Sequence, residues 1–206
     1  MIPIRDINPS ETRPVVNNTI IGVCVVVYLL ELFYGAGREV FFHHFGLVPA
    51  RVKPVPLFSY MFLHGGFWHL VSNMWFLYIF GDNIEDRLGP GRYLIFYVGC
   101  GLVSGVAHLM LNLGSPVPIV GASGAIAGVM GAYLLLFPHA RVLTLVPLFF
   151  IPLFIEIPAF FLLGVWFVLQ LLNAASTTAG ATGVAWWAHV GGFVAGIAFL
   201  KLFNVG

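Results

Sequence analysis

The segment VGASGAIAGVMGAY, residues 120–133, contains the small residues typical of closely packed transmembrane helices, together with one serine, Ser123. Gly124 and Gly128 are four residues apart, a spacing that lets a second helix backbone approach closely in a membrane. Two other apolar segments repeat this spacing, at Gly101 and Gly105 and at Gly192 and Gly196. The segment therefore predicts a packed helix, in which Ser123 is either one more small residue or a nucleophile.

The composition indicates a membrane protein. The chain has 206 residues, of which 60% are hydrophobic and 8% charged, and its mean hydropathy is +0.97. A soluble domain has about 25% charged residues, so a soluble fold is excluded. The net charge of +1 gives no support to a nucleic-acid partner. Cys24 and Cys100 lie in apolar segments and indicate neither a disulfide framework nor a metal site.

Several apolar segments approach the roughly 20 residues that a transmembrane helix needs. The six candidates are residues 18–34, 67–84, 92–113, 122–137, 158–172 and 186–203. We therefore expect an all-α membrane protein, a bundle of six transmembrane helices spanning residues 18–206.

Three segments lie outside these spans. Residues 1–17 are polar and lack the features of a signal peptide, so we expect a short cytoplasmic N-terminal segment. Residues 41–66 are interrupted by prolines and predict a structured loop at the membrane surface. Residues 142–157 are rich in proline, β-branched and aromatic residues, and predict extended chain before the fifth span.

The positions of lysine and arginine predict the orientation of the chain. With a cytoplasmic N-terminus, the inner side holds Arg5, Arg13, Arg87, Arg92, Arg141 and Lys201. The outer side holds Arg38, Arg51 and Lys53. This distribution favours a cytoplasmic N-terminus, and every even-numbered span then begins at the outer face.

Polar side chains inside a membrane are costly and are therefore candidates for function. The second span begins with FWHLVSN, which places His69 and Asn73 in its first two turns. The fourth begins with GASGA, which contains Ser123, and the sixth with WWAHVGG, which contains His189. These four residues are expected at one depth, near the outer face.

This set of residues suits hydrolysis by a serine nucleophile. A serine needs a base within hydrogen-bonding distance, and His189 is the best placed by depth. Acyl transfer also needs donors for the developing oxyanion. The N–H of Ser123 at a helix start can donate, as can the side chains of His69 and Asn73. Room for a substrate backbone beside the hydroxyl is expected at Gly121 and Gly124.

Three motifs, GASGA, HGGFWHLVSN and AHVGGFVAG, resemble the signature of the rhomboid intramembrane serine proteases of the bacterial six-helix type. The resemblance covers about residues 18–203. It implies an enzyme of the bacterial cell membrane that cleaves other membrane proteins in or near their transmembrane segments, with no metal or other cofactor. It also implies a Ser123–His189 dyad and an oxyanion hole formed by His69, Asn73 and the Ser123 N–H. IEDRLG and FGLVPARVKPVP are similar to further parts of the family pattern.

Two departures from the family leave questions open. Some bacterial members carry a tyrosine one turn after the nucleophile, stacked on the catalytic histidine, whereas this chain has Ala127. The group that orients His189 is therefore open, with Trp186, Trp187 and a residue of the second span as candidates. The Trp-Arg pair that some members carry in the first loop is absent from the sequence.

No carboxylate is obviously placed to complete a catalytic triad. Glu31 is expected near the outer end of the first span and could approach. Glu156 is expected at the start of the fifth span, where a carboxylate is favourable. His64 is expected to bond the loop backbone near the site. Helix-end hydrogen bonds in a solvated loop are expected for Asp82, Glu85 and Asp86.

Other functions fit less well. A zinc protease would need a His-Glu-x-x-His helix, which is absent, although His64, His69 and His189 could in principle bind a metal. An aspartyl protease would need two aspartates on facing helices, and a transporter would place its polar residues at the bilayer midplane. The main alternative is a rhomboid-like protein without catalysis that binds membrane clients. Such proteins lack the serine or the histidine, and both are present here.

Overall fold

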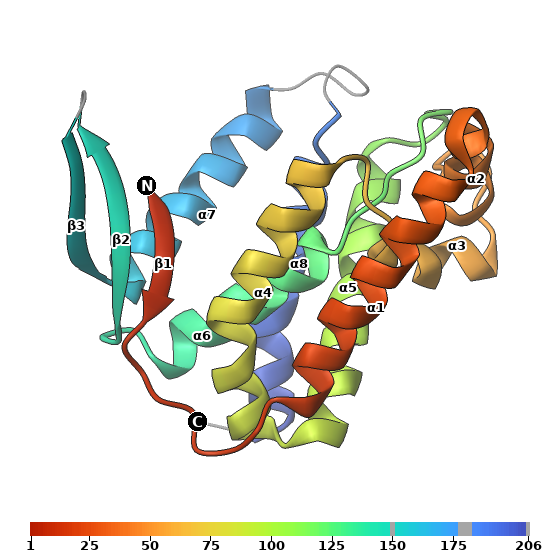
Figure 1. Ribbon diagram of the computed structural model, residues 1–206. Coiled ribbons are helices and arrows are strands. Elements are labelled where there is room, and N and C mark those ends of the chain that lie inside the picture. The colour runs from red at the N-terminus through yellow and green to blue at the C-terminus, as the bar shows by residue number, and fades with distance from the viewer. Residues whose placement is uncertain (149–150, 177–182, 205–206) are drawn as a thin grey trace.

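The computed structural model describes residues 1–148, 151–176 and 183–204 (Figure 1). Each of the six predicted spans coincides with one helix. These helices are α1 (Val15–Phe33), α4 (Phe67–Leu88), α5 (Pro90–Leu111), α6 (Ser123–Leu136), α7 (Ala159–Ser176) and α8 (Trp186–Leu202). By length and composition, α1, α5 and α7 can cross a membrane, and α6 and α8 are shorter apolar helices. The chain is therefore a mostly helical, multi-pass membrane protein.

α6 lies at the centre of the bundle, where its small residues allow close contact with α5 and α8. A methyl group at Gly192 would overlap the carbonyl oxygen of Gly124, and one at Gly196 would overlap that of Gly128. The two glycine pairs therefore form one α6–α8 seam, as their spacing predicts. The pair on α5 has a different partner: methyl groups at its two glycines would meet Met61, Leu47 and Tyr60 rather than another long helix.

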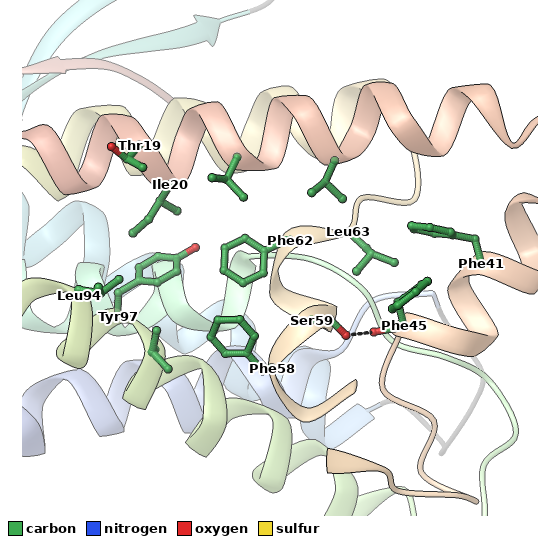
Figure 2. Close-up of a pocket in the computed structure, with 13 residues that line it drawn as sticks. Thr19, Ile20, Phe41, Phe45, Phe58, Ser59, Phe62, Leu63, Leu94 and Tyr97 are labelled. Atoms are coloured by element: carbon green, nitrogen blue, oxygen red, sulfur yellow. Dashed lines mark hydrogen bonds between the residues drawn. The ribbon is translucent and has the colours of Figure 1, made fainter. Parts of the chain in front are cut away.

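The connection between α1 and α4 is structured, as predicted. It contains α2 (Arg38–Phe45), α3 (Pro54–Ser59) and two 3₁₀ turns, η1 (Gly35–Gly37) and η2 (Tyr60–Phe62). α3 begins at a proline, which suits the first helical position because no N–H is needed there. Together with α1 and α5, this connection encloses an apolar groove of about 480 Å³, and Ser59 Oγ donates a 2.6 Å hydrogen bond to Phe45 O at its edge (Figure 2).

A three-stranded antiparallel sheet makes the all-α prediction wrong in one respect. β2 (Arg141–Leu148) and β3 (Ile151–Pro158) form a hairpin, and β1 (Ile2–Asp6) pairs with β2. The segment predicted to be extended is extended, and residues 149–150 of it lie outside the described residues. Pro147 faces Pro152 in the hairpin. Proline is incompatible with a helix interior, whereas β-branched and aromatic residues favour strands.

The sheet stands beside the helices, with β1 between the hairpin and α4 (Figure 1). The indole N–H of Trp75 on α4 donates to Pro3 O at 2.7 Å. Glu156 lies within β3, 3.9 Å from Arg141 across the hairpin, and both side chains are exposed. The expected placement of Glu156 at the start of a helix is therefore wrong, because strand pairing continues to Pro158.

The N-terminal segment runs alongside α4 and donates hydrogen bonds to its acidic residues. Ser10 Oγ donates to Asp82 at 3.2 Å, and the Thr12 N–H donates to Asp86 at 2.9 Å. Glu85 accepts the N–H groups of Val16 and Asn17 at 2.9 and 2.7 Å, which have no partner inside the first turn of α1. The predicted helix-end hydrogen bonds are present at Glu85, whereas Asp82 and Asp86 bond the segment before α1. All three carboxylates belong to α4 rather than to a solvated loop.

Candidate active site

The α6–α8 seam brings Ser123 and His189 together. Ser123 is the first residue of α6, and His189 lies in the first turn of α8. Oγ of Ser123 is 2.8 Å from Nε2 of His189, which is hydrogen-bonding distance. A hydroxyl bonded to an imidazole nitrogen is the arrangement in which a histidine can remove the hydroxyl proton.

The pair opens onto a cavity of about 580 Å³. His69 and Asn73, one turn apart on α4, line the same cavity as Ser123 and His189. The four side chains expected at one depth from the sequence therefore meet around one space.

Nε2 of His69 lies beside Gly121, on the same space as Ser123 Oγ. The N–H of Gly65 donates to Nδ1 of His69 at 3.3 Å, so that nitrogen accepts and Nε2 carries the proton. Gly121 has a φ of +131°, and a methyl group there would lie 2.8 Å from His69 Nε2 and 3.8 Å from Ser123 Oγ. Only glycine leaves both the backbone and this space unstrained.

Asn73 has an unpaired side-chain amide at the cavity. Its side chain is buried, with 6% exposed, and its Nδ2 has no hydrogen-bond partner within the described part of the chain. Buried donors are nearly always paired in folded proteins. An unpaired amide N–H beside a serine is thus available to a bound group with an acceptor oxygen.

Gly124 serves helix packing, as its four-residue spacing predicts. A methyl group there would overlap Ser104 Oγ on α5. Ser104 Oγ in turn donates to Ala188 O at 2.8 Å. A methyl group at Gly121 would instead enter the space between His69 and Ser123.

His189 is oriented by α7, which the sequence did not indicate. Nδ1 of His189 is 2.9 Å from Oε1 of Gln170. The ring centroid of His189 lies 5.9 Å from that of Trp166 and 6.0 Å from that of Trp186. Of the three predicted candidates, Trp186 does contact the ring, Trp187 lies in a separate groove with α5 residues, and no bond comes from α4. Gln170 could have been found as the one strongly polar side chain in residues 158–172.

Glu31 does not reach the dyad. It is fully buried, pairs with Arg38 at 2.9 Å and accepts the His64 N–H at 2.9 Å. Arg38 also donates to His64 O at 2.6 Å. These contacts hold the α1–α4 connection in place. The peptide group of His64 thus joins the loop to this ion pair, and its ring lies edge-on to that of His69.

The described ranges contain no group of three or more His, Cys, Asp or Glu side chains that could hold a metal ion. His64, His69 and His189 do not form such a group.

Comparison with known proteins identifies the family. A family model described as "Rhomboid domain" matches residues 52–204, about three quarters of the chain. The chain belongs to the rhomboid family. The family resemblance stated from the three motifs is thereby confirmed.

Rhomboid relatives share substantial identity with the chain. "Rhomboid protein 1, mitochondrial" of Saccharomyces cerevisiae is 31% identical over 147 residues, which is 67% of this chain and 38% of that protein. "Rhomboid protease GluP" of Bacillus subtilis is 40% identical over 72 residues, 35% of this chain and 14% of GluP. The human "Presenilin-associated rhomboid-like protein, mitochondrial" is 26% identical over 137 residues, 66% of this chain and 35% of that protein. The chain spans well under half the length of these relatives.

Proposed function

We propose that this rhomboid protein is an intramembrane serine endopeptidase with a Ser123–His189 dyad. Its substrates are other membrane proteins, cut in or near their transmembrane segments. The observation that carries the proposal is the 2.8 Å contact between Ser123 Oγ and His189 Nε2, at the edge of a cavity inside an apolar bundle. No metal or cofactor is needed for this chemistry.

The proposed reaction has two steps. His189 Nε2 takes the proton of Ser123 Oγ while the oxygen attacks the scissile carbonyl, and the same proton passes to the leaving amine. This leaves an acyl-enzyme on Ser123. A water molecule, deprotonated by His189, then attacks the ester, and the proton returns to Ser123 as the acid product leaves.

Three donors are proposed to stabilise the oxyanion of each step. They are the N–H of Ser123, the Nε2–H of His69 and the side-chain amide of Asn73. The unpaired Asn73 Nδ2 and the orientation of His69 support this role. Loss of one such donor typically lowers kcat by about 10²–10³-fold.

Six transmembrane helices, within a rhomboid domain of residues 18–206, are proposed to carry the site in a bacterial cell membrane. The distribution of Lys and Arg supports a cytoplasmic N-terminal segment and an active site near the outer face. A substrate helix would enter sideways between α4 and α7 and unwind at its outer end. Helix-breaking or small residues near the cut favour this step, because lipid does not tolerate unpaired backbone groups.

The test uses purified protein in proteoliposomes with a fluorogenic substrate that contains a transmembrane segment. Wild type is expected to cleave it and to be labelled by a fluorophosphonate at Ser123. Ser123→Ala should abolish both signals, and His189→Ala should reduce both by orders of magnitude. Cleavage by Ser123→Ala at the wild-type rate would refute the dyad. A wild type that neither cleaves nor is labelled would instead favour the client-binding alternative.

A further inference from the structure

Gln170 contacts the imidazole of His189 on the side opposite Ser123. The residue lies on α7 and is 6% exposed. Its Oε1 is 2.9 Å from His189 Nδ1, while Nε2 of the same ring is 2.8 Å from Ser123 Oγ. The imidazole therefore bridges a buried amide and the serine hydroxyl.

The amide of Gln170 is itself held in one orientation. Its Nε2 donates to Trp166 O at 3.1 Å, one turn back along α7. Because that nitrogen is already donating to a carbonyl, the oxygen of the amide faces His189. An amide oxygen only accepts, so the histidine nitrogen that it contacts must carry a proton.

This orientation decides which tautomer of His189 is stable. A neutral imidazole carries one proton, and a proton on Nδ1 leaves a lone pair on Nε2. That lone pair faces Ser123 Oγ and can accept its proton. With Gln170 turned over, the amide N–H groups would face Nδ1, the ring proton would move to Nε2, and Ser123 would lose its base.

The position of the ring is fixed by the same helix. Trp166 and Gln170 are four residues apart and so lie on one face of α7. The Trp166 ring is tilted by 34° to the imidazole at 5.9 Å, and Trp186 meets it edge-on at 89°. The position one turn after Ser123 is Ala127, which is fully buried and too short to supply an aromatic surface.

We propose that Gln170 is a positioning residue of the dyad, which holds His189 in the tautomer with its proton on Nδ1. The catalytic consequence of this inference rests on the proposed function. In cysteine proteases of the Cys-His-Asn type an amide also takes the place of the usual carboxylate.

The test compares Gln170→Leu, which keeps the size and removes the acceptor, with Gln170→Glu, which keeps an acceptor oxygen. Gln170→Leu should lower kcat by about 10–100-fold or more, as expected for a displaced general base, with KM changed by no more than about twofold. Gln170→Glu should retain kcat to within about tenfold of wild type. Asn112→Leu is the matched control, because the Asn112 amide likewise contacts a histidine ring and a backbone carbonyl one turn back, but at His108 rather than at the dyad.

A second readout follows the ring proton directly. Protein with ¹⁵N-labelled histidine is observed by NMR at a pH where the ring is neutral, and the His189 signals are assigned by their loss in His189→Ala. Wild type should show a protonated Nδ1 and an unprotonated Nε2. Gln170→Leu should shift the population towards a protonated Nε2, whereas Asn112→Leu should leave the His189 tautomer unchanged.

The outcomes separate the two proposals. An unchanged tautomer and an unchanged kcat in Gln170→Leu would overturn the role of Gln170, while cleavage that depends on Ser123 would leave the proposed function intact. Wild type without cleavage or labelling would refute the proposed function, and the ¹⁵N spectra would still decide whether Gln170 sets the tautomer. Gln170→Glu covers the case in which Gln170→Leu does not fold.

Discussion

The carbonyl oxygen of Gly124 on α6 occupies the space that a side chain at Gly192 on α8 would need. Ser123 precedes the first of these residues, and His189 lies one turn before the second. The distance between the hydroxyl and the imidazole is therefore set by direct contact of two helix backbones.

Gly192→Ala is expected to separate α6 from α8, because the added methyl meets backbone rather than a flexible side chain. Overpacking of this kind costs about 1–3 kcal/mol of stability. The lengthened Ser123–His189 contact should also lower kcat of the protein that remains folded. Cleavage rate and thermal unfolding check the prediction. Gly164→Ala on α7 is the control, since nothing lies within 4 Å of its added methyl. Equal kcat in both variants would contradict the prediction.

Gly121→Ala should disable the site while leaving the bundle folded. Its methyl would lie 2.8 Å from His69 Nε2, at a φ of +131° that side chains rarely adopt. The displaced donor predicts a fall in kcat of about 10²-fold. Gly35→Ala is a control for positive φ without a steric overlap, with a milder φ of +48° and no neighbour within 4 Å. It should lose about 1–2 kcal/mol of stability and keep its kcat, so a similar fall in kcat for both variants would point to strain alone.

The stability of the β1 contact should depend on pH through Asp6. Tyr133 donates to Asp6 Oδ2 at 2.7 Å. Burial raises the pKa of Asp6 from 3.8 to about 6; the nearby charge of Asp82 also raises it, and the Tyr133 hydrogen bond partly offsets the rise. The folded state thus binds this proton more tightly than the unfolded state. The stabilisation of the folded state by protonated Asp6 is complete below about pH 4 and is lost as the pH rises through about 6.

The measurement is Tm for wild type and Asp6→Asn between about pH 4 and pH 8. Asparagine can still accept from Tyr133 but cannot ionise, so the difference between the two Tm curves should change in favour of the variant as pH rises. Parallel curves over this range would show that Asp6 does not ionise in a buried state.

The ion pairs Glu31–Arg38 and Glu156–Arg141 should differ widely in their effect on stability. Glu31 is fully buried against Arg38 and also accepts the His64 N–H. Glu31→Gln leaves Arg38 without its counter-charge, and the loss is expected at about 3–5 kcal/mol. Glu156→Gln, at an exposed pair 3.9 Å apart, should change the free energy of unfolding by about 0–1 kcal/mol. Equilibrium unfolding compares them, and a similar loss for both variants would contradict this account of Glu31.

Much of the fold could be predicted because its determinants are local. Apolar segments of sufficient length located the six helices of the bundle to within a few residues. The starts of the even-numbered spans held the residues that meet around the cavity. The contact of Gly124 with Ser104 could not be predicted, because spacing shows that a glycine lies on a helix face but not which neighbour that face meets.

The remaining features depend on partners distant in sequence. The sheet is completed by β1, which is more than 130 residues before the hairpin in the sequence and whose residues do not themselves predict a strand. The acidic residues of α4 accept hydrogen bonds from N–H and hydroxyl groups in the first 17 residues. Gln170 is on an odd-numbered span, where only the tilt of α7 against α8 brings its amide to the far side of the imidazole.

The placement of Gln170 and Trp166 on α7 has a consequence for the timing of cleavage. If substrates enter between α4 and α7 as proposed, the entrance is bordered by the helix that aligns the base. Any displacement of α7 by an entering segment would then misalign His189 until α7 returns to its place. A membrane protein that contacts the entrance only briefly would then not be cleaved. Selectivity would depend on the residence time of a substrate segment at the site rather than on how often it collides with the entrance.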